Sequence, residues 1–294
     1  MISLFKLSRF FLITALSASL FYCYKSHQSS KQYITNLESY QFSDQRFLVR
    51  SPYGFPFLSS EKSIDRQESP TVSFIFEKLI PEKAPLLHLG AQSGLHSILI
   101  KKTLEKKGEI FAFEGHPKHY ALLKENKYLH RMGRAIKTFP LIPAAKKESL
   151  SICFEANYPT LSDTDVSTAY EQGLKGKDCQ TVNLDRLDDL KLPKIGFVLV
   201  ENTTDVSHAL QGALHLLGKS GWPPILIFPN SILTQDKNKS WTDPFKKAGY
   251  YFYRLKNIKA SSFEIDRVAP KDIASIEPCY LFFSKDLLPI SIEK

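Results

Sequence analysis

The sequence predicts an α/β fold in which helices cover both faces of a mainly parallel sheet. Short apolar runs of strand length recur along the chain, and most are separated by segments with helical spacing of apolar residues. Such alternation is typical of parallel sheets, because each crossover helix packs on a face of the sheet. We expect a seven-stranded sheet, with strands near 86–89, 110–114, 137–141, 195–201, 225–228, 250–255 and 280–284.

The stretch 86–126 contains the clearest unit of this kind. An apolar run, Leu86–Leu89, leads into the turn Gly90-Ala91-Gln92-Ser93-Gly94, and a helical pattern follows. A second apolar run, Ile110–Phe113, ends abruptly in Glu114. This pattern predicts a βαβ unit with a glycine turn after its first strand and a carboxylate after its second.

The glycine turn and Glu114 together predict a site for an adenosine-type ligand. Gly90 and Gly94 lack Cβ, which lets the backbone turn sharply and approach a ligand closely. The turn lies at the carboxyl end of a strand, where open α/β sheets bind ligands, and Glu114 is placed to accept hydrogen bonds from both ribose hydroxyls. The structural alternative is a tight strand–helix turn followed by a solvent-facing glutamate.

Two cofactors compete for this turn. A dinucleotide-binding turn has the pattern G-x-G-x-x-G, whose middle glycine admits the pyrophosphate. Here Ala91 and Gln92 follow Gly90, so the middle glycine is missing. S-adenosyl-L-methionine carries no phosphate and does not need it. The sequence therefore favours S-adenosyl-L-methionine over NAD, with an NAD-dependent oxidoreductase as an alternative.

Several motifs, in their order and spacing, resemble those of the FkbM-type SAM-dependent methyltransferases over roughly 86–255. They are the Gly90-Ala91 turn, Ala112-Phe113-Glu114, 122–126, 141–148, 181–187, Leu210-Gln211-Gly212-Ala213 and 224–228. The resemblance implies a class I methyltransferase-like (Rossmann-like) fold and methyl transfer to a hydroxyl of a small or carbohydrate-like acceptor. It also implies that the cofactor-binding residues are His88, Gly90, Ala91, Gln92, Gly94, Glu114 and Ala144.

The chain departs from the family pattern where chemistry would occur. The family usually has aspartates at the places of His88 and Glu201, a glutamate at Thr203 and a glycine at Thr204. Two interpretations follow: an enzyme retuned for another substrate, or a catalytically degenerate, membrane-anchored binding module with the same fold. Glu201 is the candidate catalytic residue, to orient or deprotonate the acceptor, with a capping or surface carboxylate as the alternative.

His88 and His116 are lesser candidates for a base, because imidazole exchanges protons near neutral pH. A histidine on a strand among apolar residues is more often a satisfied structural group, so we assign the catalytic role to Glu201 first.

Composition limits the classes of protein. The 294 residues suffice for one large core with an appendage, and 43% hydrophobic residues indicate a globular chain. The net charge of +9 comes from scattered lysines, without a basic helix interleaved with aromatics, so we expect no nucleic-acid partner. We interpret the charge as a solvated basic surface, with contact to anionic lipid or an acidic substrate as the alternative.

The cysteines and histidines predict no metal site. Cys23, Cys153, Cys179 and Cys279 show neither C-x-x-C nor metal-ligand spacing, and no histidine cluster is present in the sequence. Cys153 and Cys179 are candidates for a disulfide if the chain is exported.

The N-terminus predicts membrane targeting. Lys6 and Arg9 precede an apolar run of about fifteen residues, 10–24, and Lys25 follows. The run is short for a spanning helix, which needs about 20 residues, and its length suits a signal sequence. No clear cleavage site interrupts it. We therefore expect an uncleaved single-pass signal-anchor within 1–26, with an exported protein after signal cleavage, or an ordinary buried helix, as alternatives.

Three segments follow from these patterns. They are 1–26 as signal-anchor or signal peptide, 27–69 as linker and N-terminal cap, and 70–294 as the methyltransferase-like domain. A lead-in helix is expected from Ser69 to Ile80, and the polar segment 157–177 is expected to form a substrate loop.

Overall fold

The computed structural model describes residues 39–41, 46–60, 69–153, 179–201, 205–229, 241–275, 279–289 and 291–293. The chain divides into two compact units, Met1–Ile64 and Asp65–Lys294. In the first unit, an antiparallel sheet forms where the sequence predicted only a linker and cap. Its strands are β1 (Ser39–Gln41), β2 (Phe47–Arg50) and β3 (Pro56–Ser59).

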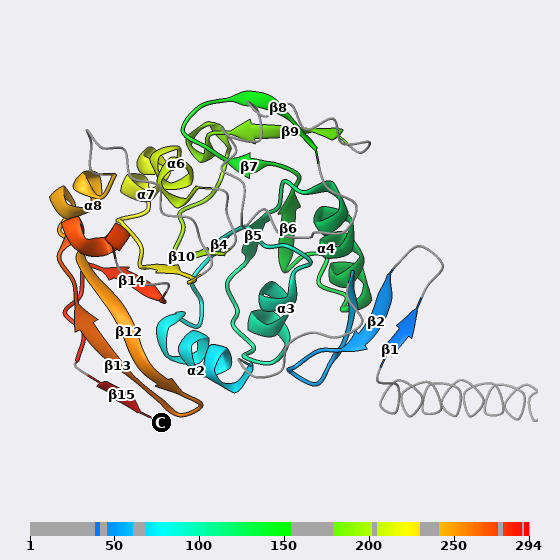
Figure 1. Ribbon diagram of the computed structural model, residues 1–294, viewed down its shortest axis with the longest axis horizontal. Coiled ribbons are helices and arrows are strands. Elements are labelled where there is room, and N and C mark those ends of the chain that lie inside the picture. Colours follow the sequence, from blue (N-terminus) through cyan, green and yellow to red (C-terminus); the bar gives the residue numbers. More distant parts are fainter. Residues whose placement is uncertain are drawn as a thin grey trace, which may run out of the picture. The chain divides into compact units, whose positions relative to one another are not determined.

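The second unit is built on a nine-stranded sheet with the order β15-β13-β12-β14-β11-β10-β4-β5-β6 (Figure 1). The five strands from β11 to β6 are parallel, and the four others join by antiparallel pairs. The strand bounds are β4 (Leu86–Leu89), β5 (Ile110–Phe113), β6 (Ile136–Phe139), β10 (Phe197–Val200), β11 (Ile225–Ile227), β12 (Tyr251–Lys259), β13 (Ser262–Arg267), β14 (Leu281–Ser284) and β15 (Ser291–Glu293).

This arrangement confirms the predicted α/β fold of the class I methyltransferase-like, Rossmann-like kind. Each of the seven predicted strands has a counterpart, namely β4, β5, β6, β10, β11, β12 and β14. The sheet is wider than predicted, because β12 turns back into β13, and β15 adds to that edge. Along β13, Phe263 and Ile265 are buried and alternate with more exposed residues, the pattern of an antiparallel strand with one covered face.

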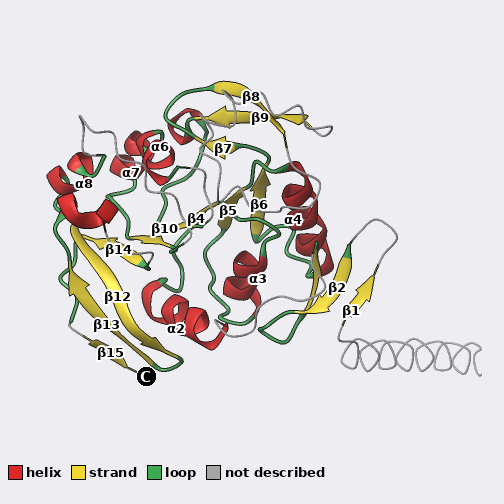
Figure 2. Ribbon diagram, viewed as in Figure 1, coloured by secondary structure: helices red, strands yellow, loops and turns green. Residues whose placement is uncertain are grey.

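Helices cover both faces of this sheet (Figure 2). One core cluster joins Leu87 and Leu89 of β4 to Leu210, Leu217 and other residues of α6 (Val206–Gln211) and α7 (Leu214–Lys219). The alternate residues of the same strands face α2 (Ser69–Leu79) and α3 (Leu95–Lys102), because successive side chains point to opposite faces. The remaining helices are α4 (Pro117–Leu129), α8 (Asp243–Lys247), η1 (Leu187–Asp189) and η2 (Pro270–Ser275).

A small separate sheet, with the order β7-β9-β8, follows the third parallel strand. Its strands are β7 (Ile142–Pro143), β8 (Glu148–Cys153) and β9 (Cys179–Asp185). The antiparallel register of β8 and β9 places the backbones of Cys153 and Cys179 directly opposite each other. The segment 157–177, predicted as a substrate loop, lies outside the described residues.

The predicted lead-in helix is present as α2, which begins at Ser69 and ends at Leu79. The apolar segment 10–24, on which the membrane prediction rests, lies outside the described residues. Among the residues that the structure does describe, no helix has both the length and the apolar character needed to cross a bilayer.

Candidate cofactor and catalytic site

The first residues after four neighbouring strands form a row along the carboxyl edge of the sheet. Each donates its backbone N–H to the last residue of the next strand, so the ladder extends one step beyond the strands themselves. The four bonds are Phe228 to Val200 (2.9 Å), Glu201 to Leu89 (2.8 Å), Gly90 to Phe113 (3.0 Å) and Glu114 to Phe139 (3.1 Å). Because neighbouring strands lie about 4.8 Å apart, the backbones of Glu201 and Glu114 are about 10 Å apart, with Gly90 between them.

The glycine turn is locked by bonds within the protein. Its backbone has positive φ at three positions, Gly90 (74°), Gln92 (47°) and Gly94 (88°). The N–H groups of Gly90 and Ala91 both donate to the carbonyl of Phe113, and that of Gly94 donates to Ala91. The N–H of Gln92 donates to Oε2 of Glu114 at 2.7 Å. Four backbone donors of the turn are therefore already used.

Gly94 is also required by packing. A Cβ at this position would lie 2.5 Å from Cδ1 of Leu123 on α4, in addition to the strain of its positive φ. Buried Asn126, also on α4, donates from Nδ2 to the carbonyl of Ser93 at 3.0 Å. Helix α4 thus fixes the shape of the turn, and Gly94 is explained by close contact between secondary-structure elements.

Glu114 is buried rather than solvent-facing, with 7% of its surface exposed. Oε1 accepts the backbone N–H of His116 and Oε2 that of Gln92, both at 2.7 Å. Burial raises the pKa of the carboxyl to about 7, and the two N–H bonds lower it in part. A carboxylate oxygen accepts more than one hydrogen bond, so each retains capacity for a ribose hydroxyl.

The loop after β5 packs against β7, which brings Ala144 near Glu114. A Cβ on Gly115 would lie 2.1 Å from Cγ1 of Ile142, so only glycine permits this approach. Ala144 is buried, and its N–H donates to the carbonyl of Asp185 at 3.0 Å. The structure therefore brings Gly90, Ala91, Gln92, Glu114 and the segment around Ala144 to one region of the sheet edge.

His116 serves the start of α4. Its Nδ1 accepts the backbone N–H of His119 at 3.4 Å, and the two imidazole rings stack with centroids 4.3 Å apart. Burial lowers the pKa of His116 to about 4, which keeps the ring neutral and makes it a weak base at neutral pH. The structure assigns His116 a capping role.

Glu201, the predicted catalytic residue, lies at the centre of a second cluster. Both of its carboxylate oxygens lie 2.8 Å from Nδ1 of His96, and Oε1 lies 3.3 Å from Nε2 of His88. Its side chain is 6% exposed. Burial alone would raise its pKa, but the two histidines outweigh burial and lower the pKa to about 2. Glu201 is therefore ionised at neutral pH and is a weak base, so orienting another group suits it better than deprotonating an acceptor.

His88 is fully buried behind this cluster. Its Nδ1 lies 2.7 Å from the hydroxyl oxygen of Ser97, and its Nε2 faces Glu201 without hydrogen-bond geometry. His88 thus supports Glu201 electrostatically from the interior of the sheet. Its predicted contact with a cofactor stays a prediction.

His96 is a residue that the sequence analysis missed. It is the second residue of α3, and its ring forms a cluster with Phe76 of α2 and Phe228, each with its centroid 5.3 Å away. Its partner Glu201 is 105 positions distant in sequence, so no local pattern connects them. The one available signal was its position directly after the glycine turn.

Two of the departures from the family pattern, Thr203 and Thr204, lie outside the described residues, as does Asn202. The described residues contain no group of three or more histidine, cysteine or acidic side chains arranged to hold a metal ion.

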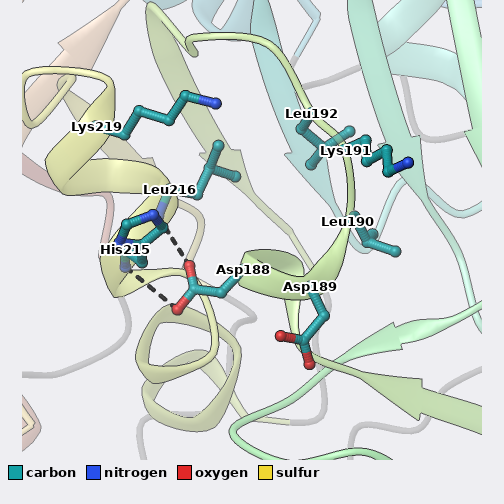
Figure 3. Close-up of a pocket in the computed structure, with 8 residues that line it drawn as sticks. All are labelled: Asp188, Asp189, Leu190, Lys191, Leu192, His215, Leu216 and Lys219. Carbon is teal, nitrogen blue, oxygen red and sulfur yellow. Dashed lines mark hydrogen bonds between the residues drawn. The ribbon is translucent and has the colours of Figure 1, made fainter.

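A pocket of about 330 Å³ lies elsewhere, between η1 and α7 (Figure 3). Its Asp188 accepts the backbone N–H groups of His215 at 3.2 Å and Leu216 at 2.8 Å, and it also pairs with Arg186. Asp188 is therefore occupied in holding the start of α7. None of the predicted site residues lines this pocket, so we do not assign it to the site.

Comparison with known proteins gave matches among solved structures. A scan against models of protein families and a search of curated proteins each found no match. The chain is similar to methyltransferase FkbM from Methylobacillus flagellatus, with 11% identity, a TM-score of 0.47 and 73% of this chain covered. It spans about half of that structure, 48% of its length.

Two further similar structures are also methyltransferases. One is precorrin-6y C5,15-methyltransferase from Geobacter metallireducens, with 17% identity, a TM-score of 0.36, and 77% of this chain and 92% of that chain covered. The other is a SAM-dependent O-methyltransferase from Thermotoga maritima, with 9% identity, a TM-score of 0.38, and 75% of this chain and 65% of that chain covered.

Proposed function

We propose that this protein is a methyltransferase that uses S-adenosyl-L-methionine to methylate a hydroxyl group of a small or carbohydrate-like acceptor. The observation that carries the proposal is the row at the carboxyl edge of the sheet. There, Glu114 and Glu201 flank the glycine turn that begins at Gly90, one strand away on either side. Ligands of open α/β sheets bind at this edge.

The residues of the row fit the cofactor in charge and in hydrogen-bonding capacity. Glu114 would accept the ribose hydroxyls, the turn from Gly90 to Gln92 would line the nucleoside, and the segment at Ala144 would lie beside the adenine. The bound cofactor supplies an electrophilic methyl group on a positively charged sulfur. Glu201 is an anion at neutral pH, which favours a positive charge in its vicinity.

The locked turn favours this cofactor over NAD. Dinucleotide sites bind the pyrophosphate with backbone N–H groups of the glycine turn that point at the ligand. In this chain the N–H groups of Gly90, Ala91, Gln92 and Gly94 donate to protein acceptors instead. A nucleoside without phosphates needs none of them.

A degenerate binding module is the second candidate. It is favoured by the sequence at Thr203, where the resembled family has a glutamate. Loss of a negative charge near the sulfonium would weaken binding of S-adenosyl-L-methionine relative to S-adenosylhomocysteine, whose sulfur is neutral. Charges a few ångströms apart near a protein surface interact by up to about 4 kcal/mol, so the preference is measurable. Thr203→Glu would shift it back toward S-adenosyl-L-methionine.

Calorimetric titration of the wild-type chain with three ligands tests the proposal. We expect S-adenosyl-L-methionine and S-adenosylhomocysteine to bind at one site per chain, and NAD to give no heat of binding. Comparable affinity for the first two supports the enzyme. A strong preference for S-adenosylhomocysteine supports the degenerate module. Binding of NAD in preference to both would overturn the proposal in favour of the oxidoreductase.

A further inference from the structure

We propose that His96 is the catalytic base, which takes the proton from the acceptor hydroxyl, and that Glu201 is the residue that positions it. This role rests on the proposed methyltransferase function. It changes the part assigned to Glu201 from the sequence, because the carboxylate would act through His96 rather than on the acceptor directly.

The partner of Nδ1 determines which nitrogen of the His96 ring carries the hydrogen. The carboxylate of Glu201 is ionised and has no proton to donate, so it can only accept. Its oxygens lie 2.8 Å from Nδ1 of His96, so Nδ1 carries the hydrogen. In a neutral imidazole the other nitrogen then carries the lone pair. Nε2 of His96 is therefore the basic atom.

The orientation of the His96 ring is fixed by its neighbours. Nδ1 is held by two carboxylate oxygens, and the ring packs against Phe76 and Phe228, whose centroids each lie 5.3 Å from its own. Glu201 is itself backed by the buried His88, whose Nδ1 is bonded to Ser97. A base whose partner is anchored from behind keeps its geometry during proton transfer.

His96 lies close to the proposed cofactor site. His96 is the second residue of α3, directly after the glycine turn, and its partner belongs to the row at the carboxyl edge of the sheet. Its side chain is 17% exposed, whereas that of His88 is 0% exposed. Of the two histidines next to Glu201, His96 is therefore the one that solvent or a ligand reaches.

The reaction balances with His96 in this role. The acceptor oxygen forms a bond to the methyl carbon while the carbon–sulfur bond breaks, and the electron pair of that bond stays on sulfur. The hydroxyl proton passes to Nε2 of His96. The positive charge thus moves from sulfur to the imidazolium, where the Glu201 carboxylate stabilises it until the proton leaves to water.

The test compares the titration of the His96 ring in two complexes of the full-length chain. Histidine ring resonances of isotope-labelled protein are followed against pH with bound S-adenosylhomocysteine and with bound S-adenosyl-L-methionine. The His96 signal is assigned by its loss in His96→Gln. If Nε2 faces the reacting methyl group, the sulfonium disfavours the imidazolium. We take a separation of about 8 Å between the sulfonium and the imidazolium and an effective dielectric constant of about 20. The titration midpoint of His96 should then be lower by roughly one to two pH units with S-adenosyl-L-methionine than with S-adenosylhomocysteine.

Internal and matched controls accompany this comparison. His130, at the far end of α4, lies roughly 20 Å along the helix from the sheet edge and should titrate alike in both complexes. Glu201→Gln should lower the His96 midpoint in the S-adenosylhomocysteine complex and mix its tautomers, and Glu201→Asp should restore both in part. Glu109 lies at the end of β5 opposite to Glu114, and Glu109→Gln should leave the His96 midpoint and tautomer unchanged.

The outcomes separate this role from the proposed function. A lower midpoint with S-adenosyl-L-methionine supports His96 as the base. Equal midpoints in the two complexes, or a His96 ring that does not titrate across the neutral range, overturn it while leaving the methyltransferase proposal standing. Failure of the wild-type chain to bind either ligand overturns the proposed function and the role of His96 with it.

Discussion

Nδ1 of His96 lies 2.8 Å from both carboxylate oxygens of Glu201, so the first turn of α3 is joined to the end of β10 across 105 positions of sequence. The contact is partly buried and joins the imidazole to an ionised carboxylate, and Glu201 follows the strand next to the one that carries the glycine turn. It gives Glu201 a partner that explains its lowered pKa. That pKa sets the pH range over which acid should reduce the stability of the fold.

Glu201→Gln should make the folded protein less sensitive to acid. The pKa of this carboxyl falls from its usual 4.5 to about 2, so its stabilising effect is present above pH 4.5 and is lost as pH falls toward 2. At about 1.4 kcal/mol per pH unit, the wild-type chain should lose up to about 3 kcal/mol more than the variant over that interval. Chemical unfolding of both proteins at a series of pH values measures this difference in the free energy of unfolding. Equally steep curves for both proteins would contradict the ionic role.

Glu114→Gln should change the pH dependence of the free energy of unfolding in the opposite direction to Glu201→Gln. Burial raises the pKa of Glu114 to about 7, so its carboxyl destabilises the fold progressively as pH rises from 4.5 through 7. The wild-type free energy of unfolding should therefore decline over that interval by up to about 3 kcal/mol more than that of Glu114→Gln. Exposed Glu109, paired with Lys137, provides the matched control, since Glu109→Gln should keep the wild-type slope. A wild-type curve that does not decline relative to the variant would refute the raised pKa.

Gly94→Ala should destabilise the domain by about 1–3 kcal/mol, because alanine is strained at a φ of 88° and its Cβ would displace Leu123. Gly133→Ala is the comparison, since a Cβ there meets nothing within 4 Å and its φ is ordinary. That change should be neutral or slightly stabilising. Thermal or denaturant unfolding of both variants decides the matter. Equal stability of the two would show that the turn is not constrained by α4.

Membrane attachment stays a prediction from the sequence, based on the apolar run 10–24 and its flanking basic residues. Full-length protein should sediment with membranes and be released by detergent but not by salt. A chain lacking residues 1–26 should be found in the soluble fraction. Intact full-length protein found wholly in the soluble fraction would defeat the prediction.

The parallel strands β5, β10 and β11 were predictable because they are buried on both faces and read as continuous apolar runs, as in Phe197–Val200. Strands β13 and β15 were not, because β13 alternates in polarity and β15 has only three residues. Positions of Gly90 and Glu114 followed from the βαβ pattern. Burial of Glu114 did not, because it depends on packing of the Gly115 loop against Ile142, which only the folded chain establishes.

Of the pair Glu201 and His96, the sequence predicted the first residue and not the second. Glu201 followed from its place after an apolar strand, whereas His96 depends on a contact between α3 and β10. His88, by contrast, was visible in sequence as an unexpected polar residue on a strand. Its burial against Ser97 and Glu201 gives it a structural task.

The most direct test of the central claim is binding of S-adenosylhomocysteine to Glu114→Gln and Glu109→Gln, two variants that each remove one carboxylate from opposite ends of the same strand. If Glu114 holds the ribose, its variant should lose about 1.5–3 kcal/mol of binding free energy, roughly 10- to 150-fold in Kd. Glu109→Gln should bind like wild type. Wild-type affinity in a folded Glu114→Gln protein, measured by calorimetry, would contradict a nucleoside site at this edge of the sheet.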